Sequence, residues 1–188
     1  MSDPGRTAST RYRELERLPG AELDRLFLQG SAPDPMALAA RVFRGVNTPA
    51  FARLLGIKKF MKGFWRAGDA VFGYNCPVRQ NGLDEPWLAK PSDDAPKRFG
   101  HYKVSRVDPV SRDSAYLHAI LLDYGRGGNP LLDPSRGLRD YLVRVAATDE
   151  EIYLGKAYFA LGPARVAVSY FLLEPDRSGP AERIGGNA

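Results

Sequence analysis

EEIYLGKAYFAL (residues 150–161) and ARVAVSYFLLE (residues 164–174) are the two runs that decide the fold of this chain. Each alternates large apolar residues with polar or small ones, and only a Gly-Pro pair separates them. Alternation with a period of two is typical of antiparallel β-strands, and Gly and Pro mark the turn between them. Similar runs occur upstream as FGHYKVSRV (99–107), SAYLHAILLDY (114–124) and LRDYLVRVA (138–146). Consecutive strands joined by turns predict an antiparallel meander.

Two of these runs, residues 114–124 and 164–174, are apolar on both faces. Successive side chains of a strand point to opposite sides, so a strand that is apolar on both sides is covered on both. The available cover outside the sheet is the set of amphipathic segments near the N-terminus. We therefore expect a mainly β fold, an antiparallel β-barrel with N-terminal helices that cap it or pack on it.

The first third of the chain predicts helices and a first strand. Residues 21–30, AELDRLFLQG, place apolar side chains at helical spacing between early acidic residues and a terminal Gly. Residues 38–45 favour a strand, with a helix opened by Asp34 and Pro35 as the alternative. Residues 48–63 predict a longer helix because a Thr-Pro pair precedes apolar residues at helical spacing. The Gly-rich segment 124–137 is the longest interruption between the later strands, and we expect it to be a loop at the barrel mouth.

The chain has the length and composition of one globular domain. Of its 188 residues, 44% are hydrophobic and 26% charged, which is enough for a sizeable core. We expect a single domain over residues 12–174, with tails at 1–11 and 175–188. The single cysteine, Cys76, has no partner for an internal disulfide, and the start of the chain lacks the apolar segment of a signal peptide. No apolar stretch reaches the roughly 18 residues of a membrane span, so we expect a cytoplasmic protein.

The positive charge is unevenly distributed. Residues 1–66 hold 12 Lys and Arg against 6 Asp and Glu, whereas the remaining residues hold 15 against 16, so the net charge of +5 comes entirely from the first third. Phosphate contacts dominate nucleic-acid binding, and a basic region is their usual signature. The arginines here are spread singly along the predicted helices, as on a solvated face. We therefore expect no nucleic-acid partner.

Polar and aromatic residues on the predicted strands suggest a small-molecule site. An apolar cavity with a few converging polar groups is the usual profile of such a site. The alternative is that each of these residues links neighbouring strands or extends to solvent. If Tyr141 faces the interior, Arg139 shares its face, and a guanidinium there invites a carboxylate from a ligand or from the protein. The candidate ligand-binding residues are Tyr116, His118, Tyr124, Arg139, Tyr141, Lys156 and Tyr158.

The residues that could carry a reaction are few. His118, beside Tyr116 or Tyr124, is the candidate acid or base, because histidine titrates near neutral pH. The alternative is a neutral core histidine bonded to a neighbouring hydroxyl, and a third use is a haem axial ligand at His101 or His118. Phosphate-binding, dinucleotide-binding and nucleophile-elbow motifs are absent, and two histidines with one cysteine give no recognisable metal site. We therefore assign no catalytic residue, metal or cofactor.

A basic amphipathic pattern follows in the predicted helix. Lys58, Lys62 and Arg66 recur every four residues beside paired apolar residues. A basic helix of this kind can lie on an anionic membrane surface. The alternative is a helix whose apolar side covers the barrel.

AARVFRG (39–45), followed by KGFW (62–65), resembles the G-x-W-x-G signature that opens lipocalin-like (calycin) barrels. Phe43 and Gly45 match the aromatic residue and the second glycine, whereas Arg41 stands where the first glycine is expected. The similarity extends to the general layout of residues 38–173. It implies carriage of hydrophobic or amphipathic molecules, sometimes haem, and occasionally isomerase or cyclase activity, and it transfers no catalytic residue.

The leading functional prediction is binding of a hydrophobic or amphipathic small molecule, lipid-like and with a polar or acidic end, inside the barrel. The first alternative is an enzyme of isomerase, cyclase or hydrolase type that acts through His118. The second is an interaction or membrane-surface protein that acts through the basic helix near residues 50–66.

Overall fold

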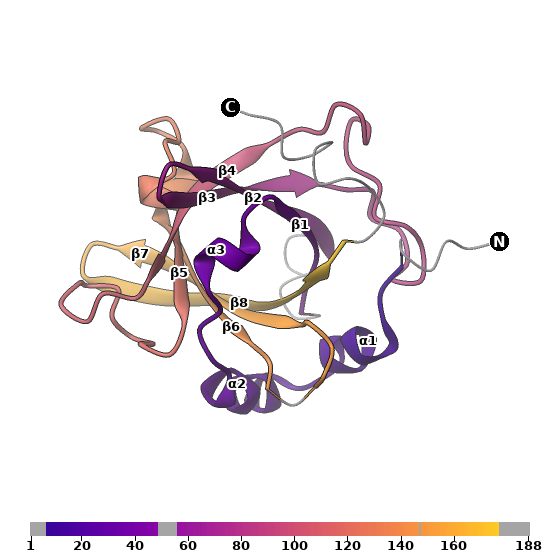
Figure 1. The fold of residues 1–188 in the computed structure, drawn as a ribbon, viewed down its shortest axis with the longest axis horizontal. Helices are drawn as coiled ribbons and strands as arrows, with labels where there is room; N and C mark the ends of the chain where they lie inside the picture. The colour runs from indigo at the N-terminus through magenta and orange to yellow at the C-terminus, as the bar shows by residue number, and fades with distance from the viewer. Residues whose placement is uncertain (1–6, 49–55, 147, 177–188) are drawn as a thin grey trace.

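The chain folds into a closed antiparallel β-barrel in which each strand pairs with the next and the last pairs with the first. The structure is a computed structural model that describes residues 7–48, 56–146 and 148–176. It confirms the predicted mainly β barrel (Figure 1). The strands are β1 (Arg41–Asn47), β2 (Lys59–Ala67), β3 (Ala70–Pro77), β4 (Phe99–Arg106), β5 (Ile120–Asp123), β6 (Leu138–Arg144), β7 (Tyr153–Leu161) and β8 (Ala164–Pro175).

Three N-terminal helices cover the barrel from outside and from one end (Figure 1). Helices α1 (Thr10–Glu16) and α2 (Gly20–Gln29) lie on the outer face, against β8 and β7 respectively. The short helix α3 (Pro35–Leu38) lies across one end, where Leu38 is buried with the interior residues. We call this the α3 end. The predicted cover of the strands is thus present, and the helix expected at residues 21–30 is α2.

The opposite end of the barrel, which we call the loop end, carries the connections β1–β2, β3–β4, β5–β6 and β7–β8. The β5–β6 connection contains the 3₁₀ turns η1 (Tyr124–Arg126) and η2 (Pro134–Gly137), so the segment expected at the mouth lies at this end. The predicted tails fall mainly outside the described residues, which begin at Thr7 and end at Asp176.

The barrel wall separates two apolar layers. Inside, Phe43 packs edge-on against Phe64 and Tyr153, with ring centroids 5.4 and 5.5 Å apart. Outside, Leu23 and Phe27 of α2 belong to a second buried cluster that covers the wall. This two-sided burial explains why residues 120–122 and 171–173 are apolar on both faces.

Glycines in the strands make room for aromatic rings on the neighbouring strand. Gly155 of β7 lies directly opposite Phe171 of β8, and a Cβ built on this glycine would lie 2.0 Å from the Phe171 Cζ. The cross-strand pairs Gly63 with Tyr74 and Gly73 with Tyr102 repeat the arrangement. A ring lying over a strand glycine restores the packing that the missing side chain would supply.

We expect Gly155→Ala to lower the free energy of unfolding by about 1–3 kcal/mol, the usual range for overpacking a core. The added methyl overlaps the buried Phe171 ring, which itself packs against Phe60. Urea unfolding monitored by circular dichroism measures the change. Gly155→Ala combined with Phe171→Leu provides the control, since the shorter side chain should relieve the overlap. A single variant as stable as the wild type would contradict this packing.

The helix predicted over residues 48–63 is wrong in its second half, where β2 begins at Lys59. Its first half falls on residues 49–55, outside the described ranges. The apolar residues of this segment fit helical spacing, but they also alternate, because Phe60 and Phe64 face the interior while Met61 packs in the outer cluster. The basic residues therefore do not form a helical face: Lys62 is buried, whereas Arg66 lies exposed at the end of β2.

The strand predicted over residues 114–124 is confirmed only for its second half, β5. Residues 107–119 form instead a loop that crosses the outer face of the barrel before β5. Asp113 in this loop lies between Arg139 of β6 and Arg165 of β8, which donate to its two carboxylate oxygens. The apolar residues of this loop, such as Tyr116, are needed to cover the wall and not to form it.

Candidate functional site

A buried ion pair lies inside the barrel. Lys62 of β2 and Asp140 of β6 face the interior, and the Lys62 Nζ lies 3.1 Å from the Asp140 Oδ2. Their side chains are only 2% and 5% exposed. Strand alternation places them there, because each lies two positions from an interior residue, Phe64 and Leu142 respectively.

Tyr124 and Asn75 complete a four-residue hydrogen-bonded group with this pair, which we call the interior cluster. The Lys62 ammonium donates to the Tyr124 Oη at 2.6 Å and to the Asn75 Oδ1 at 2.8 Å, in addition to Asp140. The Tyr124 hydroxyl donates to the Asp140 Oδ2 at 2.8 Å. The three N–H groups of the ammonium therefore each have an acceptor.

Aromatic rings surround the Lys62 ammonium. Its Nζ lies 4.8 Å from the ring centroid of Tyr102 and 5.1 Å from that of Phe171. Burial lowers the pKa of Lys62, and the Asp140 carboxylate offsets part of this shift. Burial raises the pKa of Tyr124 well above its ordinary value, and the negative charge of Asp140 raises it further. Tyr124 is thus a neutral hydroxyl that donates to the carboxylate.

Several interior residues toward the loop end are more exposed than those near the α3 end. Near the α3 end, Phe43 and Leu142 are completely buried. Toward the loop end, Asn75, Leu138 and Val168 are only half-buried. The interior cluster thus lies where the apolar interior meets its more accessible part. Chemically, it places a carboxylate, a phenol and an amide beside an ammonium in apolar surroundings.

Five of the seven candidate ligand-binding residues lie together, but outside the barrel wall. They gather under α2 and the 107–119 loop, where the hydroxyls of Tyr116 and Tyr158 are 2.6 Å apart and Lys156 pairs with Asp24 of α2 at 2.6 Å. The face assigned to them from the sequence is therefore wrong, whereas their predicted proximity is present. Their binding role stays a prediction. These residues are Tyr116, His118, Tyr141, Lys156 and Tyr158.

The remaining two candidates are separate. Tyr124 faces the interior as expected and belongs to the interior cluster. Arg139 faces outward, and it pairs with Asp113 at 3.2 Å and Asp123 at 3.1 Å. The carboxylate partners that its guanidinium was expected to need are thus supplied by the protein.

Both histidines also lie outside the wall. His118 precedes β5, and its Nε2 is 3.1 Å from the carbonyl oxygen of Phe27, to which it donates. The ring is half-buried and its partner is a backbone carbonyl, not the neighbouring hydroxyl expected for a core histidine. His101 lies beside Trp65 on the outer face, with ring centroids 6.0 Å apart. Neither ring faces the interior, so a haem inside the barrel would find no histidine ligand from these two positions.

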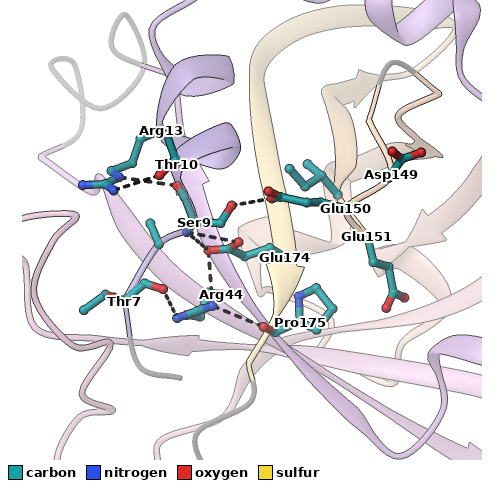
Figure 2. Close-up of a pocket in the computed structure, with 12 residues that line it drawn as sticks. Thr7, Ser9, Thr10, Arg13, Arg44, Asp149, Glu150, Glu151, Glu174 and Pro175 are labelled. Atoms are coloured by element: carbon teal, nitrogen blue, oxygen red, sulfur yellow. Dashed lines mark hydrogen bonds and ion pairs between the residues drawn. The ribbon is translucent and has the colours of Figure 1, made fainter. Parts of the chain in front are cut away.

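A groove of about 710 Å³ lies on the outside, between the N-terminal segment and the end of β8 (Figure 2). Arg44 and Glu174, both nearly buried, form an ion pair of 3.3 Å at its base. The backbone N–H of Ser9 donates to the Glu174 carboxylate, and the Ser9 hydroxyl donates to Glu150 at 2.7 Å. Burial raises the pKa of Glu174, although Arg44 acts in the opposite direction. These contacts hold the N-terminal segment against the barrel.

The sequence interpretation did not identify three members of the interior cluster, namely Lys62, Asp140 and Asn75. Lys62 lies in the segment that predicts a helix. Asp140 is next to Tyr141 on a strand, so an inward Tyr141 implies an outward Asp140. Asn75 is a single amide in a short strand, and no sequence pattern marks it as part of a site. A usable signal was present, because Lys62 stands between Phe60 and Phe64 in an alternating run.

Comparisons of the chain with protein-family models, with curated proteins and with solved structures found no match. The likeness to lipocalin-like proteins therefore rests on the closed antiparallel barrel itself. Within the described ranges, no group of three or more His, Cys, Asp or Glu residues is placed to hold a metal ion. The helices of this part of the chain are all too short or too polar to cross a membrane.

Proposed function

We propose that the protein binds a small amphipathic molecule inside the barrel. The apolar part of this molecule would lie among the interior aromatic rings, and its polar end would meet the interior cluster. The observation that carries the proposal is the buried pair of Lys62 and Asp140 in an aromatic interior, on its more accessible side. Ligand sites combine such apolar walls with a few converging polar groups.

The energetics of the interior cluster support this proposal. Removing an ammonium and a carboxylate from water carries a penalty that their mutual attraction only partly offsets. Apolar side chains of similar volume often stabilise a core as well as a buried ion pair does. Stability alone therefore does not account for the interior cluster, whereas a role in binding does.

The number of strands in the barrel is compatible with a small ligand. An eight-stranded barrel has an interior that side chains just fill or that holds one small molecule. Because α3 closes one end, entry would take place from the loop end. The small side chain of Ala157, which faces the interior beside Asp140, makes this level of the barrel the suitable place for a blocking substitution.

The proposal is tested with N-phenyl-1-naphthylamine, a neutral apolar dye that fluoresces when it leaves water. We expect saturable binding of one dye per protein to the wild type. We expect Ala157→Phe to weaken binding by about tenfold or more, equivalent to about 1.4 kcal/mol, because the ring fills the interior. Ala160→Phe, on the outward-facing side of the same strand, is the matched control.

Val168→Phe provides a second interior substitution at a half-buried position, where the larger side chain is better tolerated. Circular dichroism verifies that each variant is folded. Failure of the wild type to bind the dye would overturn the proposal. Equal binding by the two interior variants and the Ala160→Phe control would overturn it as well.

A further inference from the structure

We infer that the polar end of the ligand is an uncharged hydrogen-bond donor, with a hydroxyl as the simplest case, and not a carboxylate. This inference rests on the proposed function and narrows its ligand class. Two independent features of the interior cluster lead to it, its charge balance and its inventory of donors.

The charges of the cluster already balance. Lys62 and Asp140 face each other at 3.1 Å, and they are the buried charged residues of the described part of the chain that face the interior. The outer side of the wall holds the other buried charges, for example Arg44 with Glu174. A ligand carboxylate beside this pair would add a negative charge without a counter-charge in surroundings of low dielectric constant, which is strongly unfavourable.

The donors of the cluster are already in use. Lys62 donates to three acceptors, and the Tyr124 hydroxyl donates to Asp140. The Asn75 Nδ2 donates to the carbonyl oxygen of Gly100 at 3.1 Å and to the Tyr124 Oη at 3.2 Å. What the cluster can still offer is acceptor capacity, because a carboxylate has about four lone-pair positions and Asp140 receives two of these bonds. A carboxylate ligand, which only accepts, finds no donor, whereas a hydroxyl can donate to Asp140.

The test compares ligands of one chain length. Decan-1-ol, decyl methyl ether and decanoate are each used to displace N-phenyl-1-naphthylamine from the wild-type protein near neutral pH. We expect decan-1-ol to displace half of the dye at a concentration about tenfold or more below the concentration of decanoate that does so. The ether is neutral but accepts only, so it should be weaker than the alcohol.

The Asp140→Asn variant tests whether Asp140 causes the preference for decan-1-ol over decanoate. The substitution removes the negative charge and leaves Lys62 without a counter-ion, so the preference for alcohol over decanoate should shrink or invert.

A pH series on the wild type does not depend on the folding of the variant. From about pH 5 to about pH 8, the apparent affinity for decanoate should fall by up to about tenfold per pH unit, because only the protonated acid enters the barrel. The affinity for decan-1-ol should not change over this range.

The outcomes separate the two proposals. Absence of dye binding would overturn the proposed function itself. Dye binding together with decanoate equal to or stronger than decan-1-ol, or with a decanoate affinity independent of pH, would overturn the inference about the polar end alone. An unchanged alcohol preference in a folded Asp140→Asn variant would do the same.

Discussion

We expect Lys62→Met to lower the free energy of unfolding by about 3–5 kcal/mol, because the change leaves a carboxylate buried without its partner. Asp140 is only 5% exposed, and its neighbours Tyr124 and Asn75 cannot supply a positive charge. The double variant Lys62→Met with Asp140→Leu should recover most of the loss, to within about 1–2 kcal/mol of the wild type, since both charges are then absent. The difference between the two variants separates the cost of an unpaired charge from the net value of the pair.

Urea unfolding of both variants and of the wild type measures these effects. Lys156→Met is the matched control, because Lys156 also pairs with an aspartate, Asp24, at 2.6 Å. Asp24 is 42% exposed, so solvent screens that pair. The control should cost about 1–2 kcal/mol, which includes loss of the contact between the ammonium and the Tyr116 ring at 5.0 Å. If Lys62→Met destabilised the protein no more than Lys156→Met does, the interior would have to admit water freely to Asp140.

The second large effect is expected at Lys59, which lies outside the barrel wall and holds the β3–β4 connection. Its side chain is completely buried, and its ammonium donates to Asn81 Oδ1 at 2.6 Å and to the carbonyl oxygen of Gly82 at 2.8 Å. The same nitrogen lies 3.8 Å from the centroid of the Trp87 ring. Burial lowers the pKa of Lys59 to about 8, so the group is mainly charged at neutral pH.

Lys59→Met should lower the free energy of unfolding by about 2–4 kcal/mol, because it removes charge-assisted hydrogen bonds and a cation–π contact and leaves buried oxygens without a donor. Arg66→Met, near the other end of β2, is the control, since Arg66 is 58% exposed and pairs with the fully exposed Asp69. Amide hydrogen exchange should also accelerate at Arg79 and Lys90, whose backbone N–H groups donate to Leu88 and Pro77. Unchanged exchange at these two amides would show that Lys59 does not hold the connection.

Much of the fold could be predicted from the sequence. The strands β6, β7 and β8 were found because their residues alternate between turn signals, and α2 was found because its apolar residues repeat at helical spacing. The sequence does not identify β2 as a strand, and the reason is physical. Both of its faces are buried, one inside the barrel and one under the outer layer, and this conceals the period of two.

The candidate site was less accessible to sequence reasoning. On a strand buried on both sides, composition does not identify the inner face, so Tyr141 and Asp140 could be exchanged without violating the pattern. Tertiary contacts determine which of the two residues faces the interior, because the 107–119 loop and α2 cover Tyr141 from outside. The inward orientation of Tyr124 could be predicted from alternation, whereas that of Lys62 depended on identifying β2, and no local signal joined these residues.

The pairing of β1 with β8 has a consequence for how the chain is made. The barrel cannot close until the ribosome has released β8. Until then, the edge of β1 that pairs with β8 has no partner, because β8 lies more than a hundred residues further along the chain. Tyr12 of α1 joins this seam, since its hydroxyl donates to the carbonyl oxygens of Arg44 and Leu172. Helix α1, although it is synthesised before the strands, can therefore take its final place only after β8 has emerged.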